Sequence, residues 1–367
     1  MLNEYRRLES IDALRGFNML FITGLSGFIV ALCKLFPGGD GCFLEMQMHH
    51  AEWNGFTQYD TIFPLFLFLA GVSFPFSYAR SREKGLSSTR IYLKMVERTC
   101  ALILLGMVYN GLLRLDFAHL RFYSVLGHIG LAWMLAAVLF VNFKPLPRAG
   151  MSVAILVGYH LLCTIPAPDA TGVVDSLSKD GCLAGWIDRI LCPGHLHYGN
   201  FDPEGILSTL PATVTAMLGM FTGDFIRKDD LSGGRKTLYM LGAAVVLLGA
   251  GLVWANWFPL NKKLWTSSFT LVAGAWSLAL FAIFYWLIDI KGYKSWTLPL
   301  KVVGMNSLLC YFLPSALDID STVDFFFGGV ISLVPGQWAP VISNLAFLLI
   351  CWGILFLCYK KKIFLKV

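Results

Sequence analysis

The chain has 367 residues, of which 56% are hydrophobic and 14% charged, and its mean hydropathy is +0.65. A soluble domain carries roughly 25% charged residues, so this composition excludes a soluble globular protein, a disordered chain, a nucleic-acid-binding protein and a disulfide-stapled secreted fold. It is typical of a membrane protein. The net charge is +6. In a membrane protein, the distribution of Lys and Arg between the two sides of the membrane says more than this sum.

Long apolar runs, bounded by charged residues, proline or polar clusters, predict about ten membrane-spanning helices. In chain order they cover residues 12–34, 60–79, 97–115, 122–142, 149–165, 205–226, 237–257, 268–289, 302–317 and 339–359. We therefore expect an all-α fold, a polytopic transmembrane helical bundle that forms a single domain over residues 1–367.

Basic residues divide unequally between the two sides of these spans. The side of the N-terminus holds 22 of the 29, and the other side holds the remaining seven: Lys34, Arg114, Arg121, Lys179, Arg189, Lys262 and Lys263. The positive-inside rule then predicts that both termini are cytoplasmic. No small-residue cleavage site follows the first apolar run, so we expect this span to be retained rather than removed as a signal peptide.

Two long loops are expected on the outer face, at about residues 35–59 and 166–204. Long loops often carry function. In an oxidising compartment, the second loop would allow a disulfide between Cys182 and Cys192. No CxxC or CxxH pair suggests a metal site, and we expect none.

The inner end of the first span contains Ser10, Asp12 and Arg15. One interpretation is a helix start, with Ser10 or Asp12 capping free N–H groups. Arg15 lies a turn further into the span, where it could hold an anionic ligand from the cytoplasmic side.

The densest set of reactive side chains lies in the first outer loop, at residues 49–55 followed by Asp60. Histidine titrates near neutrality and can take a proton from a nucleophile, so His50 is a candidate base, and Asp60 could orient its imidazole or hold a substrate ammonium. The alternative is structural: interfacial histidines beside a membrane-belt tryptophan, with Asp60 as a helix cap.

Two further polar groups stand at the edges of predicted spans. Asp202, Pro203 and Glu204 resemble a helix start, yet two carboxylates on the same face as His50 would also suit a cationic or hydroxyl-rich ligand. Asn306 and His128 lie in spans, where polar side chains bond between helices or line a polar channel.

Several motifs, in order along nearly the whole chain, together resemble the heparan-α-glucosaminide N-acetyltransferase family and its bacterial relatives. They are residues 7–16 (RLESIDALRG), 50–55 (HAEWNG) with Asp60 and Phe63-Pro64, 201–207 (FDPEGIL), 261–265 (NKKLW), 304–307 (GMNS) and the tail 360–364 (KKKIF). No single motif is decisive, but this many in register is specific.

The resemblance implies a polytopic enzyme that passes an acetyl group from cytosolic acetyl-CoA to the amine of a terminal glucosamine across the membrane. It implies that His50 is the catalytic residue, with Asp60, and that Glu204, Asp202, Trp53 and Asn54 contact the sugar. The expected CoA contacts are Arg15, Asn306, His128, Lys362 and Lys366. The animal enzyme's lumenal domain is missing here, so a bacterial inner-membrane enzyme is expected, and only the family suggests a homodimer.

Two departures from the family pattern are visible. Family members carry an asparagine about eleven residues beyond the arginine that matches Arg15, and this chain has Ser26 there, so the expected stabilisation of an oxyanion depends on a hydroxyl of shorter reach. Relatives commonly have an arginine where this chain has His128. The resemblance implies that this difference changes how CoA is held or marks a subfamily with another acyl donor.

The residues leave the chemical route and the function class open. His50 could act as a general base or accept the acetyl group itself in a ping-pong route. The main alternative from another class is an amino-sugar transporter or flippase, in which the same polar residues line a translocation path. A purely structural membrane subunit would leave His50, Asp60 and Glu204 unexplained.

Overall fold

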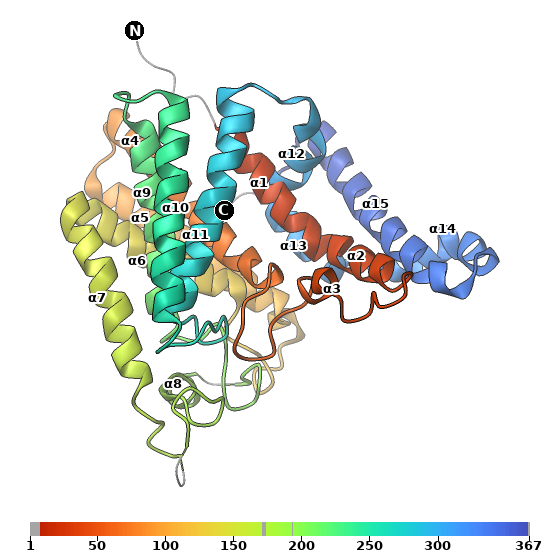
Figure 1. The fold of residues 1–367 in the computed structure, drawn as a ribbon, viewed down its shortest axis with the longest axis horizontal. Coiled ribbons are helices and arrows are strands. Elements are labelled where there is room, and N and C mark those ends of the chain that lie inside the picture. Colours follow the sequence, from red (N-terminus) through yellow and green to blue (C-terminus); the bar gives the residue numbers. More distant parts are fainter. Residues whose placement is uncertain (1–7, 171–173, 193, 366–367) are drawn as a thin grey trace. The chain divides into compact units, whose positions relative to one another are not determined.

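The computed structural model describes residues 8–170, 174–192 and 194–365, which group into two compact units. Within these ranges the regular elements are helices, and no strand is present beyond an isolated bridge between Pro166 and Cys182 (Figure 1). The prediction of an all-α fold is confirmed. The first unit comprises the described parts of Met1–Ala51, Thr57–Ile62 and Leu280–Lys366, and the second those of Glu52–Phe56 and Phe63–Ala279.

Among the described residues, seven helical stretches are long and apolar enough to cross a membrane. They are Glu9–Cys33, Tyr59–Glu83, Val125–Asn142, Pro145–Cys163, Gly233–Trp254, Ser267–Ile290 and Gly336–Lys360. Helices α5 (Ser88–Tyr109) and α9 (Thr209–Arg227) also form where spans are expected. The expected single helix over 302–317 is instead two short helices, α12 (Leu298–Gly304) and α13 (Ser307–Ala316), because the chain leaves helical geometry at Asn306.

The first unit contains helices from both ends of the chain. From the N-terminal part come α1 (Glu9–Leu20), α2 (Ser26–Cys33), α3 (Phe43–Met46) and the single turn Tyr59–Thr61; from the C-terminal part come α12, α13, α14 (Ile319–Leu333) and α15 (Ala339–Lys360). Helices α1 and α12 cross at glycines: a Cβ on Gly304 would come 1.8 Å from the Asp12 carbonyl oxygen, and one on Gly16 would come 1.8 Å from that of Leu300. Small residues let two backbones approach this closely.

The first turn of α1 is stabilised by a distant carboxylate. The two Asp289 oxygens accept hydrogen bonds from the backbone N–H groups of Glu9 (3.0 Å) and Ser10 (3.3 Å). The prediction that Ser10 or Asp12 caps this helix is wrong, because the helix begins at Glu9 and both residues lie inside it. A negative group at the positive end of the helix dipole is still present, but it comes from a residue 280 positions away.

A π-helical turn, Phe21–Leu25, joins α1 to α2 and bends the first span. Gly24 adopts φ +117° there, a conformation that residues with a Cβ rarely adopt. The Ser26 hydroxyl donates to the Phe21 carbonyl oxygen at 2.7 Å, and the buried Asn18 amide donates to the Ile62 carbonyl oxygen at 2.6 Å. Asn18 thereby ties α1 to the turn that contains Asp60.

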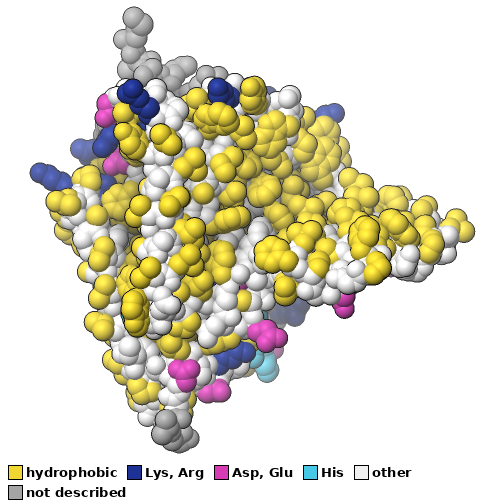
Figure 2. All heavy atoms as spheres, in the orientation of Figure 1, with side chains coloured by type: hydrophobic (Ala, Val, Ile, Leu, Met, Phe, Trp, Pro, Cys, Tyr) yellow, Lys and Arg dark blue, Asp and Glu magenta, His cyan; other side chains and the backbone are white. Residues whose placement is uncertain are grey.

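The second unit is a helical bundle. Its main helices are α4 (Ile62–Glu83, from Phe63 on), α5, α6 (Val125–Asn142), α7 (Pro145–Cys163), α8 (Leu183–Leu191), α9, α10 (Gly233–Trp254) and α11 (Ser267–Phe284, up to Ala279). Helices α4 and α9 meet at Gly71 and Gly219, where an added Cβ would lie about 2 Å from a facing carbonyl. Figure 2 shows that the visible faces of α7 and α10 carry mostly hydrophobic side chains, as lipid-facing helices do.

Substituting Gly304 tests the crossing of α1 and α12. We expect Gly304→Ala to lower the free energy of unfolding by about 1–3 kcal/mol, because the new methyl group meets backbone that cannot move aside. Thermal unfolding of the protein in detergent measures the effect. In the matched control, Gly353→Ala in α15, the methyl group meets nothing within 4 Å, so stability is unchanged or rises by up to about 1 kcal/mol. Equal melting shifts in the two variants would contradict the assignment.

Candidate functional site

In the first unit, the structure brings His50 and Asp60 together. The His50 Nδ1 lies 2.7 Å from Asp60 Oδ1. The His50 side chain is 45% exposed, whereas that of Asp60 is 1% exposed. A buried carboxylate that accepts from Nδ1–H orients the ring and fixes the tautomer whose Nε2 exchanges protons with a substrate. We name His50 and Asp60 the histidine pair.

The Asp60 carboxylate is held in place by its own loop. Its Oδ2 accepts hydrogen bonds from the Thr57 hydroxyl (3.0 Å) and from the backbone N–H groups of Thr57 and Ala51 (both 3.3 Å). These donors compensate for removing a charged group from water, which otherwise costs several kcal/mol. The carboxylate is therefore preorganised for the imidazole.

Tyr59 packs against His50 in this unit. The Tyr59 ring meets the His50 ring edge to face, with centroids 4.7 Å apart and planes at 64°. Ser26, a predicted site residue, is the first residue of α2, and its hydroxyl donates to the Phe21 carbonyl oxygen at 2.7 Å.

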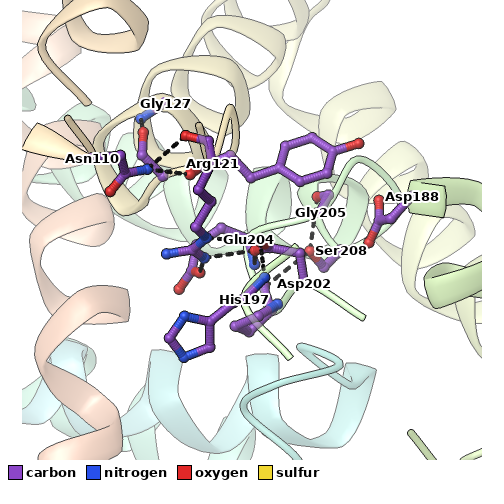
Figure 3. Close-up of polar contacts among 12 residues, drawn as sticks. Asn110, Arg121, Gly127, Asp188, His197, Asp202, Glu204, Gly205 and Ser208 are labelled. Atoms are coloured by element: carbon purple, nitrogen blue, oxygen red, sulfur yellow. Dashed lines mark hydrogen bonds and ion pairs between the residues drawn. The ribbon is translucent and has the colours of Figure 1, made fainter. Parts of the chain in front are cut away.

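The second unit contains a separate group of charged residues, Arg121, Asp202 and Glu204, which we name the arginine cluster. Arg121 binds Asp202 with two parallel hydrogen bonds, Nε to Oδ2 (2.8 Å) and Nη2 to Oδ1 (2.6 Å), and it also binds Glu204 (Figure 3). The Asn110 amide donates to the backbone carbonyl of Arg121 at 2.9 Å and so fixes the backbone segment that carries the guanidinium. Paired Arg and carboxylate groups of this geometry are strong.

Burial shifts the pKa values of several groups around this cluster. Burial raises the pKa of Glu204, against the opposing attraction of Arg121, and the pKa of Arg121 is raised by its hydrogen bonds to Asp202 and its attraction to Glu204, which outweigh burial. Burial also raises the pKa of Asp188 on α8 to about 7, although the Ile206 N–H donates to its Oδ1 at 3.1 Å. Asp188 is thus protonated and charged in similar proportions near neutral pH.

Trp53 and Asn54, which are predicted to contact the sugar, are anchored in the second unit. The Trp53 indole N–H donates to the Leu177 carbonyl oxygen at 2.8 Å, its ring packs against Phe201, and the ammonium groups of Lys179 and Lys263 lie 5.7 and 6.0 Å from its centre. The Asn54 side-chain oxygen accepts from the Asn261 amide at 3.1 Å. At these distances the two ammonium groups make cation–π contacts with the Trp53 ring.

The predicted CoA contacts have diverse surroundings. Arg15 forms a long ion pair with Asp12 at 3.9 Å. The buried Asn306 amide donates to the Ile363 carbonyl oxygen and accepts from the Leu365 N–H, both at 3.0 Å, so in this structure it holds the C-terminal tail. His128 is buried between Phe63 and Trp265. Lys362 is exposed in that tail, and Lys366 lies outside the described residues.

Two further expectations are corrected. A Cys182–Cys192 disulfide is not formed, because α8 separates the two residues and a helix of this length holds its ends about 15 Å apart, too far for a bridge. The helix expected to begin at Asp202 begins at Thr209, since the Asp202 oxygens accept from Arg121 and from the N–H groups of His197 and Glu204. In the described part of the chain, no group of three or more His, Cys, Asp or Glu side chains could hold a metal ion.

Sequence reasoning missed the roles of Arg121, Thr57 and Asp188. Arg121 carried one available signal, since it is one of three arginines among the seven basic residues on the outer side. Neither Thr57 nor Asp188 stands in a recognisable motif. The folded loop brings Thr57 beside the Asp60 carboxylate. The packing of α8 brings Asp188 beside the backbone N–H of Ile206.

The buried Asp188 predicts a pH dependence of stability. Its pKa is raised from 3.8 to about 7 on folding, so the native state binds the proton more tightly, and this group favours folding below its unfolded pKa and loses that contribution as pH rises toward 7. We expect Asp188→Asn to melt higher than wild type at about pH 8 and to lose part of the stabilisation that wild type gains at about pH 5. Melting curves at both pH values test this, with the exposed Asp230→Asn as control; parallel curves for wild type and Asp188→Asn would contradict it.

Comparison with known proteins bears on both groups of residues. The family model described as heparan-alpha-glucosaminide N-acetyltransferase, catalytic, matches residues 7–252. These residues include the histidine pair, Tyr59, Ser26 and the arginine cluster. The resemblance drawn from the sequence motifs is confirmed.

Relatives in two mammals extend the match. The chain is 25% identical to heparan-alpha-glucosaminide N-acetyltransferase of Mus musculus and 26% identical to that of Homo sapiens, in alignments over 424 residues that cover 98% of this chain. It spans 60% of the length of each relative. The chain therefore belongs to the heparan-α-glucosaminide N-acetyltransferase family.

Proposed function

We propose that this protein is a transmembrane N-acetyltransferase that moves an acetyl group from cytosolic acetyl-CoA to the amine of a glucosamine-type sugar on the extracytoplasmic side. The observation that carries the proposal is the histidine pair, a partly exposed imidazole oriented by a buried carboxylate at 2.7 Å. It lies within the match to the catalytic family model. The names of the two mammalian relatives support the transferred acetyl group and the glucosaminide class of acceptor.

The proposed role of His50 follows from the reaction. An acetyl thioester is already activated, so the enzyme must position the amine, remove its proton and stabilise the tetrahedral oxyanion. With Nδ1 donating to Asp60, Nε2 carries the lone pair that accepts the ammonium proton, and the Asp60 charge stabilises the imidazolium that results. His50 passes this first proton to water. The nitrogen loses a second proton as the C–N bond forms, and His50 takes that proton and returns it to the departing sulfur of CoA.

The proposed sidedness rests on the distribution of basic residues. With 22 of 29 on the side of both termini, the positive-inside rule makes that side cytoplasmic. We propose about ten spans, including the seven helical stretches that meet the length and hydropathy of a membrane span, and a bacterial inner membrane as location. Arg15 and the tail lysines, Lys362 among them, are proposed to meet the CoA phosphates.

The proposed acceptor contacts are Trp53, Asn54, Asp202 and Glu204. Arg121 is a single positive charge facing two carboxylates, so the arginine cluster keeps a net negative charge when both are ionised. That charge suits a sugar ammonium. The Trp53 ring offers a flat apolar face, and stacking of a pyranose on such a face leaves its hydroxyls and amine accessible.

Replacing His50 tests the proposed base. We expect His50→Ala to lose roughly 10²–10⁴-fold in turnover, since general-base catalysis typically contributes this much. The measurement is release of CoA thiol from acetyl-CoA by purified protein in detergent, with glucosamine as acceptor. His49→Ala is the matched control, because His49 is an exposed neighbour that pairs with Glu45 at 3.5 Å, and it should keep wild-type turnover. Wild-type turnover in His50→Ala would contradict the proposed role of His50. If the wild-type protein itself does not consume acetyl-CoA, the result favours a transporter.

Labelling separates the two routes through the same histidine. Because the thioester needs no further activation, we expect direct transfer, in which protein incubated with radiolabelled acetyl-CoA and no acceptor retains no label. Label retained on wild type and absent from His50→Ala would show that His50 carries the acetyl group. Turnover measured on the same preparation ensures that the enzyme is active in either case.

A further inference from the structure

We infer that Asp188 is a positioning residue for the acceptor sugar: from helix α8 it fixes the turn that presents the Glu204 carboxylate. The inference rests on the proposed function, in which Glu204 contacts the acceptor, and deepens it. Asp188, the turn and the arginine cluster all belong to the second unit. Asp188 acts through the backbone of the turn and not by touching the sugar.

The turn that carries Glu204 is closed by its own backbone. The Gly205 N–H donates to the Asp202 carbonyl oxygen at 3.1 Å, and the Glu204 N–H donates to Asp202 Oδ1 at 3.0 Å. Pro203 occupies the second position of the turn, where its fixed φ is favourable. Glu204 is therefore held rigidly within the turn, and its direction depends on how the turn is attached to the rest of the unit.

The peptide group between Gly205 and Ile206 attaches the turn at both of its polar ends. Its carbonyl oxygen accepts from the hydroxyls of Ser208 (2.9 Å) and Thr209 (3.1 Å), at the start of α9 (Figure 3). Its N–H donates to Asp188 Oδ1 at 3.1 Å. The plane of this peptide is thus fixed from α9 on one side and from α8 on the other, and it cannot rotate without breaking one of these hydrogen bonds.

The Asp188 carboxylate also fills the space beside Gly205. A Cβ on Gly205 would lie 2.1 Å from Asp188 Oδ2 and 2.6 Å from its Cγ and Oδ1, and these are the three nearest atoms. Gly205 does not have a positive φ, so space and not backbone conformation calls for a glycine here. Because Asp188 is fully buried, its carboxylate has no solvent to swing into. The same carboxylate therefore both binds the turn and packs directly against it.

This attachment determines where the turn meets Arg121. The planar guanidinium binds Asp202 by two parallel hydrogen bonds and also binds Glu204, which requires both carboxylates to be in register with one rigid group. Without Asp188, the Gly205–Ile206 peptide is free to rotate on the α8 side, and the turn can shift against Arg121. The proposed contact with the sugar amine is then misplaced, and a displacement of about 1 Å can cost roughly 10²-fold.

Replacing Asp188 tests the positioning role. We expect Asp188→Ala to raise the KM for glucosamine roughly 10–100-fold, with kcat and the KM for acetyl-CoA nearly unchanged, because only acceptor contacts are displaced. Asp188→Asn should keep a KM close to that of wild type, since its amide oxygen also accepts from the Ile206 N–H. Steady-state kinetics of the purified full chain in detergent, with each substrate varied in turn, measure these constants.

A double-mutant cycle tests the contact with Gly205. Gly205→Ala alone should also raise the KM for glucosamine, because the new methyl group meets the Asp188 carboxylate. In the Asp188→Ala background the same change should add little, since the atoms that it meets are gone. Melting curves establish that each variant is folded, and Asp188→Ser, too short to reach the peptide, replaces Asp188→Ala if alanine does not give folded protein.

The remaining outcomes separate this role from folding and from the proposed function. Ile190→Ala, at an exposed position of α8, should leave both KM values unchanged. A loss confined to kcat, equal rises in both KM values, or no recovery in Asp188→Asn makes Asp188 a folding residue only and overturns the inference. An unchanged KM in Asp188→Ala, with Glu204→Gln raising it, overturns the role of Asp188 alone. A wild type that does not consume acetyl-CoA overturns both the inference and the function.

Discussion

Every buried charge of this protein needs partners, because burying an unpaired carboxylate or ammonium costs far more than a single contact returns. Asp60 satisfies the requirement within ten residues of chain, from Ala51, Thr57 and His50. The buried Lys236 on α10 satisfies it by donating to the Ile226 and Lys228 carbonyl groups at the end of α9. The same requirement that stabilises the fold therefore also orients the imidazole.

This requirement explains which parts of the site the sequence could predict. His50 and Asp60 lie ten residues apart, and their residue types alone suggest a base and its orienting carboxylate. Arg121 and Asp202 are 81 positions apart, and Glu9 and Asp289 are 280 apart. No local pattern encodes such pairs, so the partner of Asp202 and the cap of α1 could be found only in the folded chain.

The helices also fall into those that the sequence predicted and those whose bounds depend on distant contacts. Apolar runs predicted most of them, since a membrane requires long uncharged segments with internal hydrogen bonds. The exceptions have polar causes. Asp202, Pro203 and Glu204 have the composition of a helix start, but Arg121 and two backbone N–H groups take the Asp202 oxygens, and the helix begins only at Thr209. Asn306 breaks the run over 302–317, and its amide binds the tail instead.

The histidine pair has the proton arrangement that the proposed base requires. A base must be able to gain a proton, so its second nitrogen must already donate, and Asp60 accepts from the Nδ1 of His50 at 2.7 Å. Asp60 can remain charged and buried in this position because Thr57 and Ala51 donate to its other oxygen. The contacts that allow this carboxylate to be buried therefore also fix the orientation of the proposed base.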